Sequence, residues 1–401
     1  MTTASPIEGA AARRVDFARI ADEAGGAVFL VIVILAAIFV AFLFGLRAEK
    51  IFSLPATIDG ASREDVAAFW RAGRMAIEGA AASAYDAETF RAGLPAPDKG
   101  LLWLNPPHFL LIVAPLGLLP FPAAKGAIIA ASIASLLLMV RTINPRPLFY
   151  AAILLSPAAF ASALVMQTGP MIALGLASAL VLSERRPVLA GLILAVLTMK
   201  PQYGLFAPIF LAARGEWRAF VVASIGAVTL AALSAALFGA EVWMTFFHAV
   251  SGGEIAAHGA RLHRDMVTIH QTIGKLGGSE ALRATGQLAA MAISGAGVFL
   301  AAKRWPRDAA IGFTLLASAF ASPSLWIYDW PLVAAGLFML ARAGAPFPPA
   351  LQLLAGALWI APLISLGFTT MESALAAPAI FAAALAAFWF WGEKLTREAA
   401  L

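Results

Sequence analysis

Long apolar runs, separated by short polar connectors, dominate the sequence. The first run extends from Gly26 to Leu46, and further runs lie near residues 101–119, 123–140, 148–166, 169–183, 187–199, 203–213, 219–238, 284–302, 308–322, 330–342, 349–367 and 371–391. A spanning helix needs about 20 apolar residues, and several runs are shorter than that. The pattern predicts an all-α, polytopic membrane protein of about 12 or 13 transmembrane or re-entrant helices. We expect residues 1–401 to form one integral membrane domain.

The segment before the first run, residues 1–25, carries Arg13, Arg14 and Arg19. A signal peptide also has a basic start, but its apolar region is only roughly 7 to 15 residues long and a small-residue cleavage site follows it. The run from Gly26 to Leu46 is longer and lacks such a site. It therefore predicts the first transmembrane helix.

Basic residues are concentrated in the short connectors and the C-terminal tail: Arg141, Arg146, Arg185, Arg186, Arg214, Arg218, Lys303, Arg304, Arg307, Arg342, Lys394 and Arg397. Cytoplasmic loops of membrane proteins are enriched in Lys and Arg. We therefore expect these connectors and both termini on the cytoplasmic side of the inner membrane. The opposite helix ends then present Gln167, Lys200 and Asp329 to the outside, together with two longer outer loops, 47–104 and 241–283.

This topology needs an odd number of crossings between the first outer loop and Arg141, yet two apolar runs lie between them. Prolines surround the first of these runs, at positions 106, 107, 115, 120 and 122. Irregular backbone at membrane depth is tolerated where protein or a water-filled cavity covers it. We therefore expect residues 101–121 to dip in and return, or to lie partly along the surface.

Composition supports the membrane class and limits the possible chemistry. Hydrophobic residues make up 61% of the chain and charged residues 13%, about half of the roughly 25% that is usual in soluble proteins. Cysteine is absent, which excludes disulfides, zinc–thiolate sites and a cysteine nucleophile. The net charge is +5, but in a membrane protein the positions of the basic residues matter more than their sum, so we expect no nucleic-acid partner.

Neither a metal nor a soluble nucleotide is indicated by a motif. His263 and His270 are seven residues apart and could share a helical face, but no third ligand is evident. A Gly-rich phosphate loop and the H-E-x-x-H pattern are both missing from the sequence. We expect no cofactor.

Residues 62–78 of the first outer loop have the spacing of an amphipathic helix that could lie in the outer membrane interface. One face carries Val66, Phe69, Trp70, Gly73 and Ile77, and the other carries Arg71, Arg74 and Glu78. Ser62 and Asp65 fit a capping box, in which Asp65 reaches back to the Ser62 amide. From spacing alone we favour this capping role for Asp65 over catalysis. Arg71 and Arg74 are, on the same grounds, more typical of a solvated face than of phosphate ligands.

Three polar sites interrupt the apolar runs at their expected outer ends. Lys200 precedes Pro201 and Gln202, and it is either a lysine that extends to the interface or a functional group, as ionisable residues in membrane segments often are. Asp329, after Tyr328, could instead cap a helix N-terminus. The Gln167-Thr168-Gly169 sequence fits a tight turn or a polar ligand site, and spacing does not decide between them.

Taken in order, these segments resemble glycosyltransferase family 87, membrane enzymes of the GT-C class related to the phosphatidylinositol-mannoside mannosyltransferases. The resemblance covers about residues 60–340 and rests on Asp65–Arg74, Ala84-Tyr85-Asp86, Leu104-Asn105-Pro106-Pro107-His108-Phe109, Ala114–Pro120, Gln167-Thr168-Gly169, Glu184–Gly191, Thr198–Gln202 and Ser322–Asp329. The order and spacing of these motifs carry the resemblance, because each motif alone is unspecific.

The resemblance implies transfer of a hexosyl residue, mannose by family default, from a polyprenyl-phosphate donor to a lipid or glycan acceptor at the outer membrane face. Asp65 matches the presumed general base, which reverses the preference for a capping role. Cations would stabilise the leaving phosphate, and Lys200 and the loop arginines are candidates. We expect the substrate-binding residues to be Arg71, Arg74, Asn105, His108, Gln167, Lys200, Gln202, Tyr328 and Asp329.

The chain departs from the family pattern at two places. It has Asn105 where many relatives carry Tyr before Pro-Pro, and Tyr328-Asp329 where the mannosyltransferases tend to carry two histidines. The leading alternative is a transporter or lipid flippase, which would show paired repeats and polar residues at mid-membrane. Here the polar residues gather at outer helix ends instead. A non-catalytic membrane scaffold is a third possibility, against which the presence of Asp65 and Lys200 argues.

Overall fold

The structure is a computed structural model that describes residues 17–53, 64–94, 101–252, 257, 263, 266–344, 346–367 and 375–398. The helices of the first half are α1 Phe17–Glu23, α2 Ala27–Phe52, α3 Asp65–Ile77, η2 Ala82–Tyr85, α4 Ala87–Ala92, η3 Pro107–Phe109, α5 Leu110–Gly117, α6 Phe121–Ile143, α7 Pro147–Leu154, α8 Pro157–Val165, α9 Gly169–Leu182 and α10 Pro187–Leu197. Those of the second half are α11 Ala207–Arg214, α12 Trp217–Phe238, α13 Glu241–Gly252, α15 Ile269–Lys275, α16 Glu280–Arg304, α17 Arg307–Phe320, η4 Ile327–Asp329, α18 Pro331–Arg342, α19 Pro349–Gly367 and α20 Ala376–Glu398. Within these ranges the β pairing is one isolated bridge, between Met266 and Trp326.

The predicted class, an all-α polytopic membrane protein, is confirmed. Six described helices are long and apolar enough to cross a membrane, namely α2, α6, α12, α16, α19 and α20. The bent pair α7–α8 is either a broken seventh span or a re-entrant loop. The remaining apolar runs form shorter helices, such as α9, α10, α17 and α18. The break predicted at Pro201 is present, because α10 ends at Leu197 and α11 begins at Ala207.

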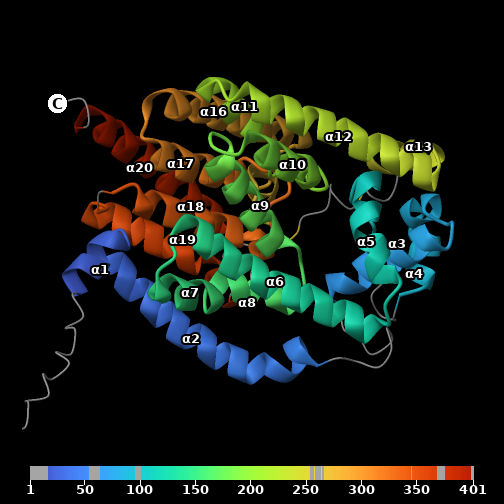
Figure 1. The fold of residues 1–401 in the computed structure, drawn as a ribbon. Coiled ribbons are helices and arrows are strands. Elements are labelled where there is room, and N and C mark those ends of the chain that lie inside the picture. Colours follow the sequence, from blue (N-terminus) through green and yellow to red (C-terminus); the bar gives the residue numbers. More distant parts are fainter. Residues whose placement is uncertain are drawn as a thin grey trace, which may run out of the picture.

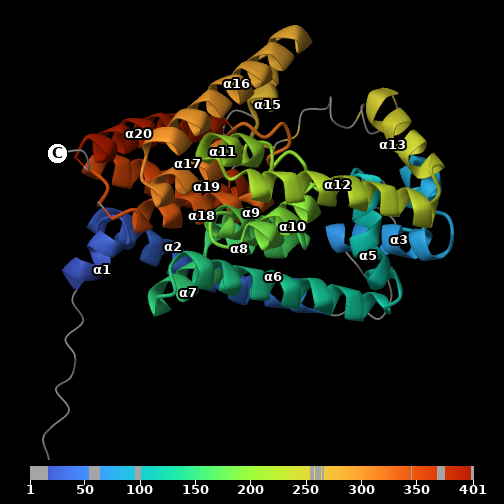
Figure 2. The ribbon, with the colours of Figure 1, turned by 45° about the horizontal axis from the view of Figure 1, so that its top comes forward.

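The helices are arranged between two distinct ends of the molecule. Helices α3, α4, α5 and α13 lie together at one end, which we call the loop end, whereas α1 and the C-terminal end of α20 lie at the other (Figures 1 and 2). We call this second end the basic end, because the arginine-rich connectors meet there. Helices α2 and α6 run side by side along the molecule between the two ends (Figures 1 and 2).

Specific contacts hold the connectors of the basic end together. Arg307, at the start of α17, forms an ion pair with Glu216 before α12 and donates to the Ser183 hydroxyl after α9 at 3.0 Å. Arg342, at the end of α18, donates to the carbonyl of Ile143 at the end of α6 at 2.7 Å. The connectors that contain Arg307 and Arg342, which share a basic character in the sequence, are thus held to neighbouring helix ends at the basic end.

Residues 101–121 stay at the loop end, which agrees with the expectation that this segment does not cross. Helix α5 packs on α3, where the indole nitrogen of Trp70 donates to the Leu119 carbonyl at 2.9 Å. The two helices approach most closely at Gly73 and Gly117, since a Cβ on Gly73 would stand 2.2 Å from the Val113 carbonyl oxygen. Only glycine permits such an approach. One candidate span, α6, then lies between the first outer loop and Arg141.

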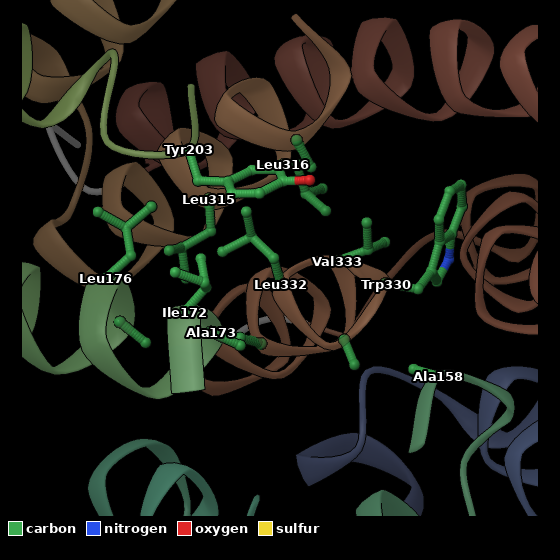
Figure 3. Close-up of a cluster of buried hydrophobic side chains, with 14 of the residues drawn as sticks. Ala158, Ile172, Ala173, Leu176, Tyr203, Leu315, Leu316, Trp330, Leu332 and Val333 are labelled. Atoms are coloured by element: carbon green, nitrogen blue, oxygen red, sulfur yellow. The ribbon is translucent and has the colours of Figure 1, made fainter. Parts of the chain in front are cut away.

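The centre of the molecule is a buried apolar cluster formed by α9, α17 and α18. Figure 3 shows Ile172 and Leu176 of α9, Leu315 and Leu316 of α17, and Leu332 and Val333 of α18 together, with Tyr203 beside them. All of these side chains are nearly inaccessible to solvent. A helix that is apolar around its whole circumference is typical of such an interior position. This core places the turn after α10, which holds Lys200, against the segment before α18, which holds Asp329.

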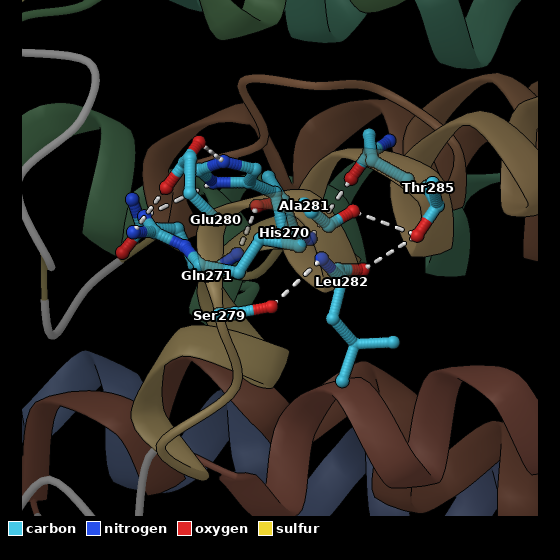
Figure 4. Close-up of polar contacts among 10 residues, drawn as sticks. His270, Gln271, Ser279, Glu280, Ala281, Leu282 and Thr285 are labelled. Carbon is cyan, nitrogen blue, oxygen red and sulfur yellow. Dashed lines mark hydrogen bonds and ion pairs between the residues drawn. The ribbon is translucent and has the colours of Figure 1, made fainter.

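The described part of the second outer loop includes the helices α13 and α15. Helix α15 is joined to α16 by polar contacts (Figure 4): His270 bonds to Glu280 at 2.9 Å, and Arg283 pairs with the same carboxylate at 2.7 Å. His263 precedes α15 and packs on the Trp326 ring. His263 and His270 therefore do not share a helical face, because α15 begins only at Ile269.

Candidate active site

The side chain of Gln167 connects two of the ionisable residues selected from the sequence. Its amide nitrogen Nε2 donates to Oδ2 of Asp65, at the start of α3. Its amide oxygen Oε1 accepts from Nζ of Lys200, after α10, at 3.0 Å. Gln167 and Lys200 are buried, and Asp65 is half-buried. Residues from three separate parts of the chain thus form one hydrogen-bonded group, which we call the Gln167 network.

Asp329 and Tyr203 extend the network beyond Lys200. Nζ of Lys200 lies 3.8 Å from Oδ1 of Asp329, and the Tyr203 hydroxyl donates to Oδ2 of the same carboxyl. Asp329 is only 2% exposed. Burial raises the pKa of the Asp329 carboxyl, and the charge of Lys200 and the hydrogen bond from Tyr203 oppose this shift. The network therefore ends in a buried carboxyl that carries its negative charge less readily than an exposed one.

The backbone around Gln167 explains why this sequence forms a turn there. Helix α8 ends at Val165, and Met166 follows in the left-handed conformation, with φ of 55°. A Cβ on Gly169 would lie 2.3 Å from the Tyr328 carbonyl oxygen, so the start of α9 can approach η4 only with glycine at this position. The Gln167-Thr168-Gly169 sequence is therefore both a tight turn and a polar site, and the two interpretations left open do not exclude each other.

The position of Asp65 in α3 differs from the one that the capping box required. Helix α3 begins at Asp65 itself, and Glu64 is its N-cap, without a side-chain cap hydrogen bond. In the predicted capping box Asp65 would be the third helical residue and would bond to the amide of Ser62, which lies outside the described residues. Among the described residues, the carboxylate of Asp65 accepts a hydrogen bond from Gln167, 102 positions further along the chain.

The structure also bears on two other expected roles. Lys200 is 8% exposed, so it does not extend to the interface as a snorkelling lysine would. Asp329 lies in the first turn of η4, where a helix N-terminus favours an acid, and its carboxyl also bonds to Tyr203.

The amphipathic helix predicted in the first outer loop exists, but it is buried more deeply than a helix lying on the membrane surface. Its apolar face packs against protein: Phe69 contacts the rings of Trp103 and Phe109. Ile77, which the spacing placed on that face, is 42% exposed. Arg74 forms an exposed ion pair with Glu78 at 2.8 Å, as expected from their common face.

Arg71 leaves the polar face of this helix and extends toward α4, where it donates to the Thr89 carbonyl at 3.4 Å. A Cβ on Gly93 would meet its guanidinium. Arg71 and Arg74 are therefore not among the residues whose hydrogen bonds define the Gln167 network. Their proposed role as substrate ligands stays a prediction.

His108 and Asn105 belong to a neighbouring group at the loop end. Nε2 of His108 lies 3.1 Å from the hydroxyl of Thr198, two residues before Lys200, and its ring stacks on Trp243 of α13. Nδ1 of His108 is buried and has no hydrogen-bond partner among the described residues. The Asn105 carbonyl accepts from the Tyr85 hydroxyl at 2.7 Å.

The two remaining predicted ligands lie close in sequence to the network. Tyr328 precedes Asp329, its ring stacks on Trp326, and its carbonyl accepts from the Ser162 hydroxyl. Gln202 is half-buried, in the turn that also holds Lys200 and Tyr203. The sequence did not single out Tyr203. Its only signal was its position directly after Gln202, in a chain that has four tyrosines.

Comparison with known sequences identifies the family. The sequence profile of glycosyltransferase family 87 matches residues 103–325, more than half of the chain. The chain belongs to this family. The protein is therefore a membrane glycosyltransferase that acts with membrane lipids, a sugar donor and an acceptor. The matched region contains Asn105, His108, Gln167 and Lys200, whereas Asp65 and Asp329 lie outside it. No curated protein and no solved structure matches the chain.

Proposed function

We propose that this glycosyltransferase transfers a hexosyl residue, mannose by family default, from a polyprenyl-phosphate donor to a lipid or glycan acceptor. The reaction would take place at the outer face of the cytoplasmic membrane. The observation that carries the proposal is the Gln167 network, in which one amide side chain contacts both a carboxylate and an ammonium group. These two groups have the opposite charges that base catalysis and phosphate departure require.

Asp65 would be the general base of the reaction. Its carboxylate takes the proton of the acceptor hydroxyl while that oxygen bonds to the anomeric carbon and the bond from this carbon to the phosphate oxygen breaks. The half-buried position of Asp65 supports this role, because an acceptor hydroxyl can reach it from the exposed side. The hydrogen bond from Gln167 fixes the orientation of the carboxylate.

Lys200 would bind the phosphate of the donor and stabilise the charge that it gains on leaving. An ammonium group has three hydrogen-bond donors, and among the described residues Lys200 makes one hydrogen bond, to Gln167. Asp329 lies 3.8 Å from Lys200, beyond hydrogen-bond distance. The hydrogen-bond donors of Lys200 that these contacts leave over support a phosphate site here.

The proposal is tested with two variants, Asp65→Asn and Lys200→Ala, purified in detergent and assayed with a panel of polyprenyl-phosphate hexoses and a membrane-lipid extract as acceptor. Asp65→Asn should lower turnover by about 10² to 10⁴-fold, the usual effect of losing a general base, and should still bind donor. Lys200→Ala should bind donor poorly.

Asp86→Asn is a matched control, since Asp86 lies in the same outer loop and caps α4 through the Thr89 amide, a role that Asn fills equally well. It should keep wild-type turnover. Near-normal turnover by a folded Asp65→Asn protein would show that Asp65 is not the base. Equal donor binding by Lys200→Ala and the wild type would remove Lys200 from the phosphate site.

A further inference from the structure

A buried ion pair lies directly before Asp65 in the chain. Nζ of Lys125, in the first turns of α6, is 2.9 Å from Oε1 of Glu64. Lys125 is 1% exposed and Glu64 is 2% exposed. The same ammonium lies 3.5 Å from the carbonyl oxygen of Lys50, near the end of α2. Lys125, in α6, therefore contacts both the end of α2 and Glu64, the N-cap residue of α3.

The surroundings of this pair are apolar. The first turn of α3 belongs to a buried cluster formed by Val40, Ile51, Val66, Ala67, Phe121, Ile128, Phe160 and Met166. Burying two charges in such a place is costly, and replacing a buried ion pair with apolar residues often leaves stability unchanged or increases it. Burial also raises the pKa of the Glu64 carboxyl, against the effect of Lys125. Stability alone is therefore a poor explanation for the pair.

The pair lies where it can affect the position of Asp65, because Glu64 is the N-cap of α3 and Asp65 is the next residue. Glu64 does not use its side chain to cap α3; its carbonyl accepts the first helical hydrogen bond, from Ala67 at 2.9 Å, while its carboxylate turns to Lys125. Asp65 is the next residue, and its own carboxylate accepts from Gln167. Moving the start of α3 by a fraction of a helical turn would break that contact. We propose that Glu64 and Lys125 are positioning residues that hold Asp65 against Gln167 in the orientation needed for proton transfer.

This inference rests on the proposed role of Asp65, and its test separates the two. The main variant is Glu64→Leu/Lys125→Met, in which both charges are removed and the new side chains join the apolar cluster. We expect it to fold with a melting temperature near that of the wild type. Its kcat should fall about 10- to 100-fold, because small misplacements of a catalytic group have effects of this size. KM should stay within about twofold, since neither residue is expected to touch substrate.

A second measurement distinguishes positioning from a merely structural role. If the pair acts by holding Asp65 against Gln167, the loss of kcat in Glu64→Leu/Lys125→Met should not multiply with that in Gln167→Leu, because both changes break the same contact. Glu398→Gln is the control: it breaks an exposed ion pair with Lys394 in α20, away from the site, and should leave kcat unchanged. Lys125→Arg, which keeps the charge, should retain most of the wild-type kcat.

If the apolar variant does not fold, the charge-reversed variant Glu64→Lys/Lys125→Glu provides the test. It exchanges the two side chains and so keeps an ion pair whose two side chains together have the same length. A kcat within about tenfold of the wild type would support the inference. Three results would overturn the inference. They are a wild-type kcat in the folded apolar variant, a loss of kcat in that variant that multiplies with the loss in Gln167→Leu, and a folded charge-reversed variant as inactive as Asp65→Asn. If the Asp65→Asn protein is itself active, any of these results would reject Asp65 as the base and not the positioning role alone.

Discussion

Gln167 contacts both groups to which chemistry is assigned, and the orientation of its amide follows from those contacts. An ammonium group only donates hydrogen bonds, so the amide oxygen must face Lys200, and the nitrogen must then face the Asp65 carboxylate. The same oxygen also accepts from the Thr168 backbone amide at 3.1 Å. A glutamate at this position could not donate to Asp65 and would repel it. The amide is thus the side chain that the two charges require.

Replacing Gln167 with leucine should therefore impair catalysis more than folding. Both hydrogen bonds to charged groups disappear, which should cost about 1–3 kcal/mol of unfolding free energy and lower turnover at least about tenfold, because Asp65 loses the contact that orients it. Turnover per folded protein and thermal stability in detergent check this expectation. Gln287→Leu is the control, since Gln287 is equally buried and bonds to His270 and Ala321 away from the network. If both variants lost the same proportion of turnover, the network would have no special role.

Residue types and positions in the sequence were enough to single out Gln167, Lys200 and Asp329, because polar groups between apolar runs are costly without a purpose. For Asp65 the spacing favoured a helix cap, and the role of base came from the family resemblance alone. Their partners were not predictable in the same way. Lys125 stands near the start of a long apolar run and carries no motif, and its partner Glu64 is 61 positions away. Such a pairing depends on how α3 and α6 pack, which no local pattern encodes.

At the scale of whole elements, close contacts between glycines and neighbouring backbones determine where the site residues stand. The start of α9 touches η4 at Gly169, and α3 touches α5 at Gly73. The first contact aligns Gln167 with Asp329, and the second fixes the helix that carries Asp65. Apolar periodicity predicted that these helices exist, whereas the approach distances depend on the tertiary fold and were not predicted.

Gly169→Ala should separate α9 from η4, because the new Cβ would lie 2.3 Å from the Tyr328 carbonyl oxygen. Overpacking of this kind costs about 1–3 kcal/mol, and the shift of η4 should lower turnover by moving Asp329 away from Lys200. Gly45→Ala is the matched control, since a Cβ there has no neighbour within 4 Å and alanine favours the helical state. Thermal stability and turnover of the two variants decide the matter, and equal behaviour would mean that the α9–η4 contact relaxes without consequence.

On the scale of the whole molecule, the arginine-rich connectors and the Gln167 network lie in separate places. The arginine-rich connectors meet at the basic end through Arg307 and Arg342, while the Gln167 network lies where α9 begins and α10 ends, toward the other end. The sequence predicted this separation from the alternation of apolar runs and basic connectors. It also predicted the exception, residues 101–121, from the prolines that interrupt them.

The side of the membrane that each end faces is the last prediction. We expect the basic end in the cytoplasm and the loop end outside, because cytoplasmic loops are enriched in Lys and Arg. The chain has no cysteine, so Glu88→Cys and Lys303→Cys each introduce a single thiol, and both positions are exposed. Their neighbours Phe90 and Trp305 are buried and would label poorly on either side. An impermeant thiol reagent should label Glu88→Cys in intact cells and Lys303→Cys only after the membrane is permeabilised. The reverse pattern would place Asp65 and Lys200 toward the cytoplasm, and the donor would then have to be bound from the inner leaflet.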